Sequence, residues 1–271
     1  MATPLWFVTL IKKTFSQIFF LAKLTHVPGI GRLIERGLFE GDDIMYLPGD
    51  RVVRVNRDLN GIGSMVVPSQ VVEHFIQEAN YHWVMDFCIC RDACRCKDYP
   101  LGLGCLFLGE AVLGINPRLG RLVSQNEALE HVARCREAGL VHLIGRNKLD
   151  SVWLNVRPGQ KLLTICNCCP CCCLWRILPG TAPRISSKIT RMPGVTVFVT
   201  EKCQGCGTCT HAVCFVNSLH LVEGRAVIGG DCRGCGRCVS TCPNGAIEMK
   251  VEDQNFINQS IDRIGKVVDV R

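Results

Sequence analysis

The sequence lacks the glycine and serine signatures that mark several large enzyme classes. It contains no Gly-x-Ser-x-Gly elbow, no Walker A loop and no Rossmann fingerprint. The Gly-x-Gly pieces at 29–31 and 102–104 are typical of turns rather than of phosphate cradles. No basic run has interleaved aromatic residues, so we expect no nucleic-acid partner. The chemistry must therefore come from other residue types.

A secretory leader is also missing from the pattern. The first 25 residues are apolar, but Lys12 and Lys13 interrupt them, and no cationic segment precedes an uninterrupted apolar core. The longest apolar run is too short to predict a transmembrane segment. We therefore expect a cytoplasmic protein whose thiols stay reduced.

Cysteine is what the sequence has in excess, at 20 of 271 residues. Disulfide scaffolds of this density are normally short and secreted, so the count points to metal binding, with iron–sulfur ligation first and zinc second. With 48% apolar residues the chain can bury a real core. Its 31 Lys and Arg exceed its 24 Asp and Glu, and the surplus lies within 1–194, which favours an acidic protein partner or an anionic ligand.

Helical periodicity is strongest in residues 4–24. One side of this predicted helix carries the apolar positions Phe7, Val8, Ile11, Phe15, Ile18, Phe19 and Ala22. The ordinary interpretation is a helix docked on its own protein. The alternatives are a helix lying on a membrane surface or in a partner's groove.

Other local patterns predict a mixture of helices and strands. We expect helices at 31–38 and 68–80, a capping box of Ser124 and Glu127 opening a helix that Gly139 ends, and a last helix near 254–268 that packs back on the body. Strands are predicted at 51–55 and 161–166. Cys135 lies on an apolar helix face and is interpreted as a small core residue.

The clearest signal is an internal repeat of cysteines. The first run consists of Cys203, Cys206, Cys209 and Cys214, and the second of Cys232, Cys235, Cys238 and Cys242. The first three cysteines of each run are 29 residues apart, and the fourth cysteines are 28 residues apart. The flanking apolar segments repeat as well, which indicates a duplicated strand–loop–helix–strand unit. A Cys-x2-Cys-x2-Cys loop can wrap three corners of a cubane, and the fourth must come from elsewhere. Glycines flank the middle cysteine of each run and let backbone N–H groups approach the sulfurs: Gly205, Gly207, Gly234 and Gly236.

On these residues, 195–250 resemble a bacterial-type dicluster ferredoxin domain, in which the fourth cysteine of each run serves the other cluster. The resemblance implies two [4Fe–4S] clusters. Cluster one would be held by Cys203, Cys206, Cys209 and Cys242, and cluster two by Cys232, Cys235, Cys238 and Cys214.

The sequence departs from that family at two positions. Four residues instead of three separate Cys209 from Cys214, and Phe215 replaces the usual proline, whereas Cys242-Pro243 keeps it. If one cluster is labile, the spacing predicts the one that uses Cys214. Two zinc sites fit the pattern less well, because zinc sites usually pair their cysteines.

Twelve further cysteines precede the repeat, and eleven of them form two tight groups. The members are Cys88, Cys90, Cys94, Cys96 and Cys105, then Cys166, Cys168, Cys169, Cys171, Cys172 and Cys173. In an extended chain Cys88 and Cys90 would point the same way, as would Cys94 and Cys96. The neighbouring Arg91, Arg95 and Lys97 should lower the thiol pKa. Pro170 prevents a regular helix and predicts a tight loop offering three or four sulfurs to one site.

We expect at least one further iron–sulfur cluster shared between these two groups. A structural zinc and a reactive dithiol are the alternatives, since sulfur-only sites suit both iron clusters and zinc. No named cluster motif is recognisable before residue 195.

Together these patterns predict an α+β protein. Its parts are a cysteine-rich domain at 1–194, a pseudo-twofold ferredoxin-type domain at 195–250 with a hairpin at 219–228, and a C-terminal helix at 251–271. The first functional hypothesis is electron transfer to or from a partner oxidoreductase in an anaerobic cytoplasm, as an electron-transfer protein or oxidoreductase subunit rather than a stand-alone enzyme. The alternative is an oxidoreductase or reductive activase whose N-terminal cysteines act on a bound substrate.

Overall fold

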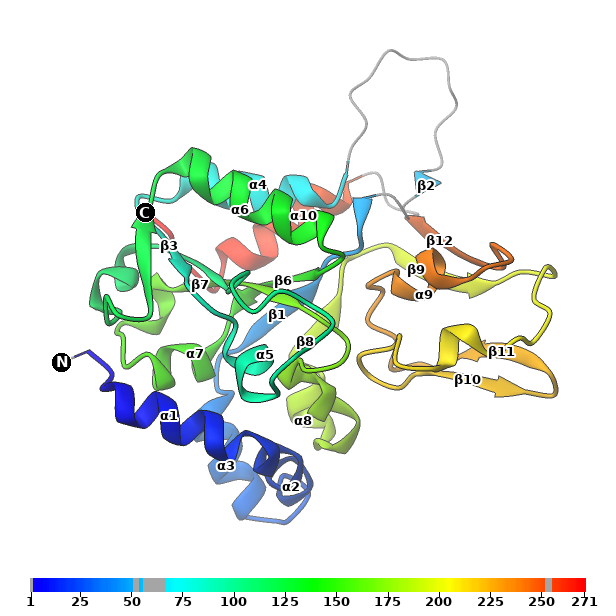
Figure 1. The fold of residues 1–271 in the computed structure, drawn as a ribbon, viewed down its shortest axis with the longest axis horizontal. Coiled ribbons are helices and arrows are strands. Elements are labelled where there is room, and N and C mark those ends of the chain that lie inside the picture. Colours follow the sequence, from blue (N-terminus) through cyan, green and yellow to red (C-terminus); the bar gives the residue numbers. More distant parts are fainter. Residues whose placement is uncertain (1, 51–53, 56–66, 252–254) are drawn as a thin grey trace.

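A computed structural model describes residues 2–50, 54–55, 67–251 and 255–271. Helices and mixed sheets alternate along the chain, so the predicted α+β class is confirmed. A larger body holds a seven-stranded sheet with helices on both faces, and a smaller body holds the two shorter sheets (Figure 1). The chain leaves the larger sheet after Arg191 and enters the smaller body at Val195.

The seven-stranded sheet places its cysteine-bearing strand in the middle. In spatial order it consists of β5 (Gly120–Val123), β3 (His82–Met85), β4 (Leu106–Leu108), β7 (Leu163–Cys168), β6 (Val141–Arg146), β1 (Asp43–Tyr46) and β8 (Ile189–Arg191). Neighbours are antiparallel except β1 and β8, which are parallel. The strand predicted at 161–166 is β7, buried between β4 and β6 because both of its faces are covered.

One face of this sheet is covered by α4 (Ser69–Glu78), α6 (Gln125–Glu137) and α10 (Phe256–Gly265) (Figure 1). The predicted capping box opens α6, with Ser124 and Glu127 bonded reciprocally. Phe256 and Ile264 of α10 are buried against the body, so the predicted packing of the last helix is confirmed.

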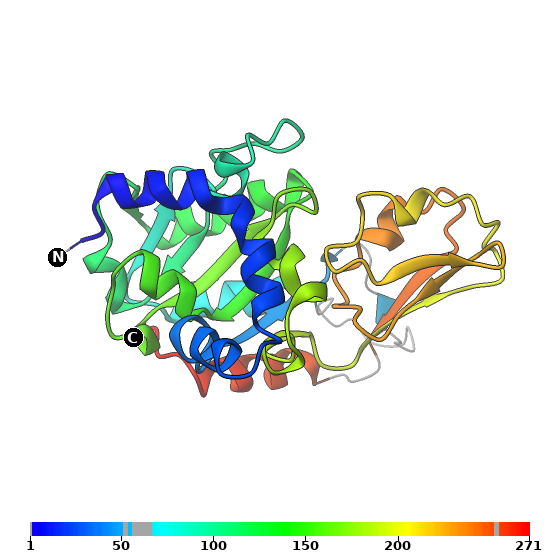
Figure 2. The same cartoon turned by 90° about the horizontal axis from the view of Figure 1, so that it is seen from below.

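The other face is covered by a larger number of elements. These are α1 (Leu5–Thr14), η1 (Phe15–Gln17), α2 (Ile18–Leu24), α3 (Ile30–Leu38), α5 (Ile89–Ala93), η3 (Glu110–Gly114), α7 (Lys148–Trp153), η4 (Gly159–Lys161), η5 (Leu174–Gly180) and α8 (Pro183–Ser186). Figure 2 shows α1, α2 and α3 lying together on the near side of the larger body.

The N-terminal helical segment docks by a narrow seam. Val8, Phe15 and Ala22, seven residues apart, are its buried side chains, whereas Phe19, predicted on the same side, is 41% exposed. Over Leu5–Leu24 the segment is long and apolar enough to cross a membrane by length and composition, with 11% of an 18-residue window buried. Residues interrupted by Lys12 and Lys13 thus still form one helical stretch of that length, and the absence of a transmembrane segment stays a prediction.

The smaller body is built from the two repeats. Its elements are β9 (Val195–Val199), η6 (Thr208–Thr210), β10 (Leu219–Val222), β11 (Arg225–Ile228), α9 (Arg237–Thr241) and β12 (Ile247–Val251). The first strand pairs with the last, β9 with β12, and the predicted hairpin pairs β10 with β11 through Glu223 and Gly224, at φ 49° and 75°. The strand predicted at 51–55 lies partly outside the described residues. Its last two, β2 (Arg54–Val55), pair with β12 and so join the smaller body's sheet.

Candidate metal centres

Each quartet of the repeat lines a cavity of its own in the smaller body. The first cavity is lined by Cys203, Cys206, Cys209 and Cys242. The second is lined by Cys232, Cys235, Cys238 and Cys214. The fourth cysteine is thus exchanged between the two runs, as the resemblance implies. Four sulfurs around one cavity are the donor set that a cubane cluster requires.

Backbone N–H groups donate to the sulfurs in a pattern that repeats between the sites. The N–H of Ser218 donates to Cys214 Sγ at 3.3 Å. The N–H of Ala246 donates to Cys242 Sγ, also at 3.3 Å, and in both cases the donor follows its cysteine by four residues. Such bonds favour the more negative, reduced form of a cluster and help to set its potential.

The glycines of the two loops are required by backbone conformation. Gly205 and Gly207 have φ of 67° and 77°, and Gly234 and Gly236 repeat these values at 65° and 77°. At Gly205 an added Cβ would lie 2.0 Å from the carbonyl oxygen of Gly224. Left-handed backbone with no room for a side chain leaves glycine as the residue that fits.

The extra residue before Cys214 is absorbed by an irregular loop. The second run forms the short helix α9, whereas the first forms η6 and then turns at Ala212, whose φ is 55°. Phe215, in place of proline, is 4% exposed and meets the ring of Tyr46 edge-on at 5.6 Å. Phe215, which departs from the family pattern, thus contacts the larger body.

The two sites differ in exposure and in the acidity of their thiols. Cys206 of the first site is exposed and Cys203 is half-buried. Hydrogen bonds from the backbone N–H groups of Ala226 and Gly205 hold the pKa of Cys203 below its usual value. At the second site burial raises the pKa of Cys235 to about 12, because a buried thiolate loses its hydration.

Tyr46 joins the second site to the larger body. Its side chain is 0% exposed, and its hydroxyl has no hydrogen-bond partner among the described residues. It packs in one cluster with Cys168 and Cys173 of the larger body, and Cys235 lies against that cluster. Sulfurs of the two bodies are therefore neighbours of the same aromatic ring.

Two arginines of the second loop fasten the bodies together. Arg237 donates to the carbonyl of Gly139 at 2.8 Å and to the hydroxyl of Tyr99 at 3.0 Å. Arg233 donates to the carbonyl of Ser186 at 3.2 Å. The cavity of the second site thus faces the interface, and the cavity of the first site lies away from it.

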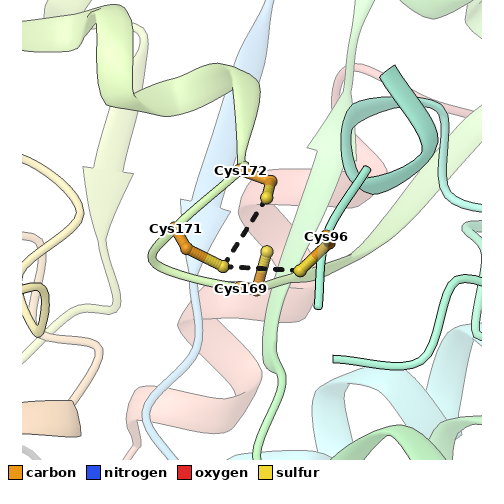
Figure 3. Close-up of side chains that lie close together, drawn as sticks. All are labelled: Cys96, Cys169, Cys171 and Cys172. Carbon is orange, nitrogen blue, oxygen red and sulfur yellow. Dashed lines mark hydrogen bonds between the residues drawn. The ribbon is translucent and has the colours of Figure 1, made fainter. Parts of the chain in front are cut away.

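Four other sulfurs converge in the larger body. Cys169, Cys171 and Cys172 come from the loop after β7, and Cys96 comes from the chain that follows α5 (Figure 3). All four Sγ atoms lie within 4.8 Å of one another, and Cys171 Sγ is 3.6 Å from both Cys96 Sγ and Cys172 Sγ. A tetrahedral ion with metal–sulfur bonds of about 2.3 Å holds its sulfurs about 3.8 Å apart. The group has the size for one metal ion, whereas a cubane spreads its thiolates over four irons.

The chain through residues 88–96 is not extended. Residues Ile89–Ala93 form α5, and Cys88 is its N-cap residue. Cys94 is exposed, and its thiol reaches the carbonyl of Cys172 at 3.9 Å instead of the four-sulfur group. Cys135 is fully buried, as predicted for a core residue.

The predicted effect of the basic neighbours on these thiols is partly wrong. Burial acts to raise the pKa of Cys96, but backbone N–H groups of Asp98 and Tyr99 outweigh it and the pKa is lowered. Neither Arg95 nor Lys97 is among its leading causes. The other six predicted cysteines lie outside this group, and each is buried or half-buried: Cys88, Cys90, Cys105, Cys166, Cys168 and Cys173.

Comparison with known proteins assigns the second run of the repeat. Residues 227–248 match the family model described as 4Fe-4S binding domain. This segment is therefore of an iron–sulfur-binding type. The match contains Cys232, Cys235, Cys238 and Cys242, and the part before residue 195 has no family assigned. No curated protein and no solved structure matches the chain.

Sequence reasoning missed two residues around these centres. Tyr46 gave no signal, because its neighbours come from distant segments of the chain. Arg91 was noted only as a neighbour of thiols, although its side chain is 0% exposed. A buried arginine inside a cysteine-rich segment could have been suspected from its position between Cys90 and Cys94.

Proposed function

We propose that the protein passes single electrons through two [4Fe–4S] clusters, to or from a partner oxidoreductase. The observation that carries the proposal is the pair of four-cysteine cavities with different surroundings. One reaches the surface at Cys206, and the other meets the larger body at Tyr46. This arrangement supports an electron path with one end open to a partner. When bound, the clusters supply the one-electron steps, and the chain fixes their spacing and surroundings.

We assign the ligands as the cavities group them. Cluster one takes Cys203, Cys206, Cys209 and Cys242, and cluster two takes Cys232, Cys235, Cys238 and Cys214. The repeated N–H donors to Cys214 and Cys242 favour this exchange, since each fourth cysteine has the same local geometry.

We also propose a further metal centre in the larger body, at Cys96, Cys169, Cys171 and Cys172. Their close spacing favours one zinc or iron ion over a cubane. Because all 20 cysteines are free thiols, a reducing cytoplasm is the compartment that we propose. The basic surplus of residues 1–194 favours an acidic redox partner.

Anaerobic metal and sulfide counting, with EPR of the reduced full-length protein, tests this function. We expect at least about eight irons per chain, four for each cluster, and spin coupling between two neighbouring reduced clusters. Colourless protein without visible charge-transfer absorption would refute the proposal. If the wild type contains zinc or a ninth iron and a Cys96→Ala/Cys171→Ala variant lacks it, that ion belongs to the four-sulfur site.

A cleft between the bodies favours a second candidate, an oxidoreductase or reductive activase that acts on a bound substrate. The cleft is lined by residues of both bodies, among them Arg136, His142, Cys235 and Arg237. It therefore reaches a ligand of cluster two, and its lining mixes the cations Arg136 and Arg237 with the acids Asp50 and Glu137. Small anions or thiols that perturb the EPR signal of cluster two would favour the enzyme, whereas an unresponsive signal would favour the electron-transfer protein.

A further inference from the structure

The six cysteines of the larger body outside the four-sulfur group and apart from Cys94 and Cys135 form a second sulfur group. They come from the start of α5, the start of β4, and the end of β7 with the residues after it: Cys88, Cys90, Cys105, Cys166, Cys168 and Cys173. Cys166 and Cys168 lie two residues apart on β7 and so share a face. Antiparallel pairing of β4 with β7 brings Cys105 opposite Cys166, with their sulfurs 3.9 Å apart.

These sulfurs close into a ring. Cys168 and Cys173 pack in one buried cluster, and Cys166 lies against that cluster. Cys90 in turn has Cys173 and Cys168 as electrostatic neighbours, and Cys105 has Cys88. All are free thiols, so the group is not a set of disulfides.

A buried cation lies between this ring and the four-sulfur group. Arg91 is 0% exposed, and its guanidinium donates to the carbonyls of Pro100 (2.9 Å), Asn167 (2.7 Å) and Leu103. Among the described residues it forms no ion pair with a carboxylate. Its electrostatic neighbours are thiols of both groups: Cys88, Cys105, Cys168 and Cys169. A buried charge needs a counter-charge, and a metal centre held by thiolates supplies one.

We propose that the six-sulfur ring holds an iron–sulfur cluster on four of its thiolates, with Arg91 as its counter-charge. The inference rests on the proposed function, because this cluster exchanges electrons with cluster two across Tyr46, which packs against Cys168, Cys173 and Cys235. Packing alone explains the ring less well, because Arg91 would then be a buried cation beside neutral thiols, with no carboxylate partner among the described residues. The chain then has separate places for a cluster and for a single ion.

The test is iron counting and EPR on full-length wild type and on a Cys166→Ala/Cys168→Ala variant. We expect about twelve irons in the wild type and about eight in the variant, at four per cluster, with the signals of the ferredoxin-type clusters kept. Cys135→Ala is the matched control, since it removes a buried thiol outside the ring and should leave the iron count unchanged.

The outcomes separate this inference from the proposed function. A wild type with about eight irons, or nine with an ion in the four-sulfur group, overturns the third cluster and leaves the electron-transfer proposal standing. Loss of iron from the ferredoxin-type domain itself overturns both. The wild-type count decides the matter even if the double variant does not fold.

Arg91 is tested through the reduction potential of the third cluster. Removing a cation beside a cluster disfavours its more negative reduced form, so Arg91→Met should make that signal harder to reduce. Arg91→Lys keeps the charge and should restore the potential. If the EPR signal of the third cluster has the same reduction potential in wild type, Arg91→Met and Arg91→Lys, Arg91 is not its counter-charge.

An independent observation concerns the surface formed by α1, η1, α2 and α3. Half of the sixteen exposed large apolar side chains in the described residues gather there: Trp6, Leu10, Phe19, Phe20, Leu21, Val27, Ile30 and Leu33. Trp6, Phe20 and Leu33 are 68%, 64% and 73% exposed. Patches of this kind on soluble proteins mark interaction sites.

Charge indicates what this surface meets. The elements of this surface contain Lys12, Lys13, Lys23, Arg32 and Arg36 and one acid, Glu35, which is paired with Arg184 and Lys188. Lys12 is engaged with Asp92 of α5 at 2.7 Å, which holds α1 on the body, and the other four cations are exposed. Apolar side chains mixed with cations fit a bilayer surface that contains anionic lipid.

We infer that this surface lies on an anionic membrane. The segment docks through Val8, Phe15 and Ala22 while its opposite side stays exposed, which suits a helix lying flat rather than crossing. Because α5 begins at the six-sulfur ring, such docking would bring that ring to the membrane side of the molecule.

Cosedimentation of the full-length protein with vesicles tests this surface. We expect at least about tenfold tighter binding to phosphatidylcholine vesicles containing phosphatidylglycerol than to phosphatidylcholine alone, reduced by salt. A Trp6→Ser/Phe20→Ser/Leu33→Ser variant should lose it. The matched control is Leu113→Ser/Leu122→Ser/Val227→Ser, exposed apolar residues elsewhere. Equal binding by both variants, or concentration-dependent dimerisation without lipid binding, would overturn the inference. If alkaline buffer did not extract the protein from the vesicles, a transmembrane segment would replace the surface helix.

Discussion

The two cysteine quartets of the repeat share a motif but lie in different surroundings. The first is at the far end of the smaller body, with Cys206 exposed. The second faces the larger body, where Cys235 is next to a packed cluster that includes Tyr46 and Phe215. The same loop, the same glycines and the same N–H donors thus serve one site open to water and one covered by protein.

This difference separates what a motif specifies from what a fold adds. The Cys-x2-Cys-x2-Cys run specifies the donor set, because its spacing and glycines are local. Access, dielectric and redox potential depend on neighbours contributed by distant segments, such as Tyr46 and Arg237. Equal ligands therefore need not give equal clusters.

Removing one fourth cysteine should have the largest effect. Because the fourth cysteines are exchanged, Cys242→Ala should abolish the cluster built on Cys203, and Cys214→Ala the one built on Cys232. Each variant should lose about four irons per chain and keep the other cluster's EPR signal. If Cys242→Ala instead abolished the signal of the Cys232 site, the exchange of ligands would be wrong.

Truncation next to the fourth cysteine should affect stability unequally. Phe215 is buried against Tyr46, so Phe215→Ala should lower the free energy of unfolding by about 3 kcal/mol. The matched residue Pro243 is exposed, and Pro243→Ala should stay within about 0.5 kcal/mol. Anaerobic thermal unfolding measures both. Equal changes in the free energy of unfolding would show that Phe215 stabilises the second site no more than Pro243 stabilises the first.

Much of this arrangement is readable from the sequence, and the reasons differ by region. The repeat is local in sequence, so its strands, hairpin and glycines follow from spacing and turn chemistry. The α6 capping box is equally local. In contrast, α5 was not predicted, because a five-residue helix has no periodicity to detect. The division of the early cysteines into a four-sulfur and a six-sulfur group depends on β4 pairing with β7, which no local pattern encodes.

We expect the second cluster to resist chelators better than the first, which is the opposite of the order that the cysteine spacing predicts. The extra residue before Cys214 argues for a weak second cluster, but Ala212 absorbs it and the larger body covers the site. We expect the first cluster to lose iron about tenfold faster, corresponding to about 1.4 kcal/mol in the barrier to its release. Anaerobic iron release to a chelator, with each cluster followed by EPR, measures both rates. Faster loss from the second cluster would show that loop strain outweighs burial.

The smallest expected effect comes from loosening the cover over the second site. Arg237→Ala removes the bonds to Gly139 and Tyr99, each worth about 1 kcal/mol. The second cluster should then release iron a few times faster and approach the rate of the first. Arg225→Ala is the control, since Arg225 pairs with Glu201, whose side chain is 93% exposed, and such surface pairs contribute little. If both variants left the second cluster's rate unchanged, the larger body would not be what protects it, and the difference between the sites would lie within the loops themselves.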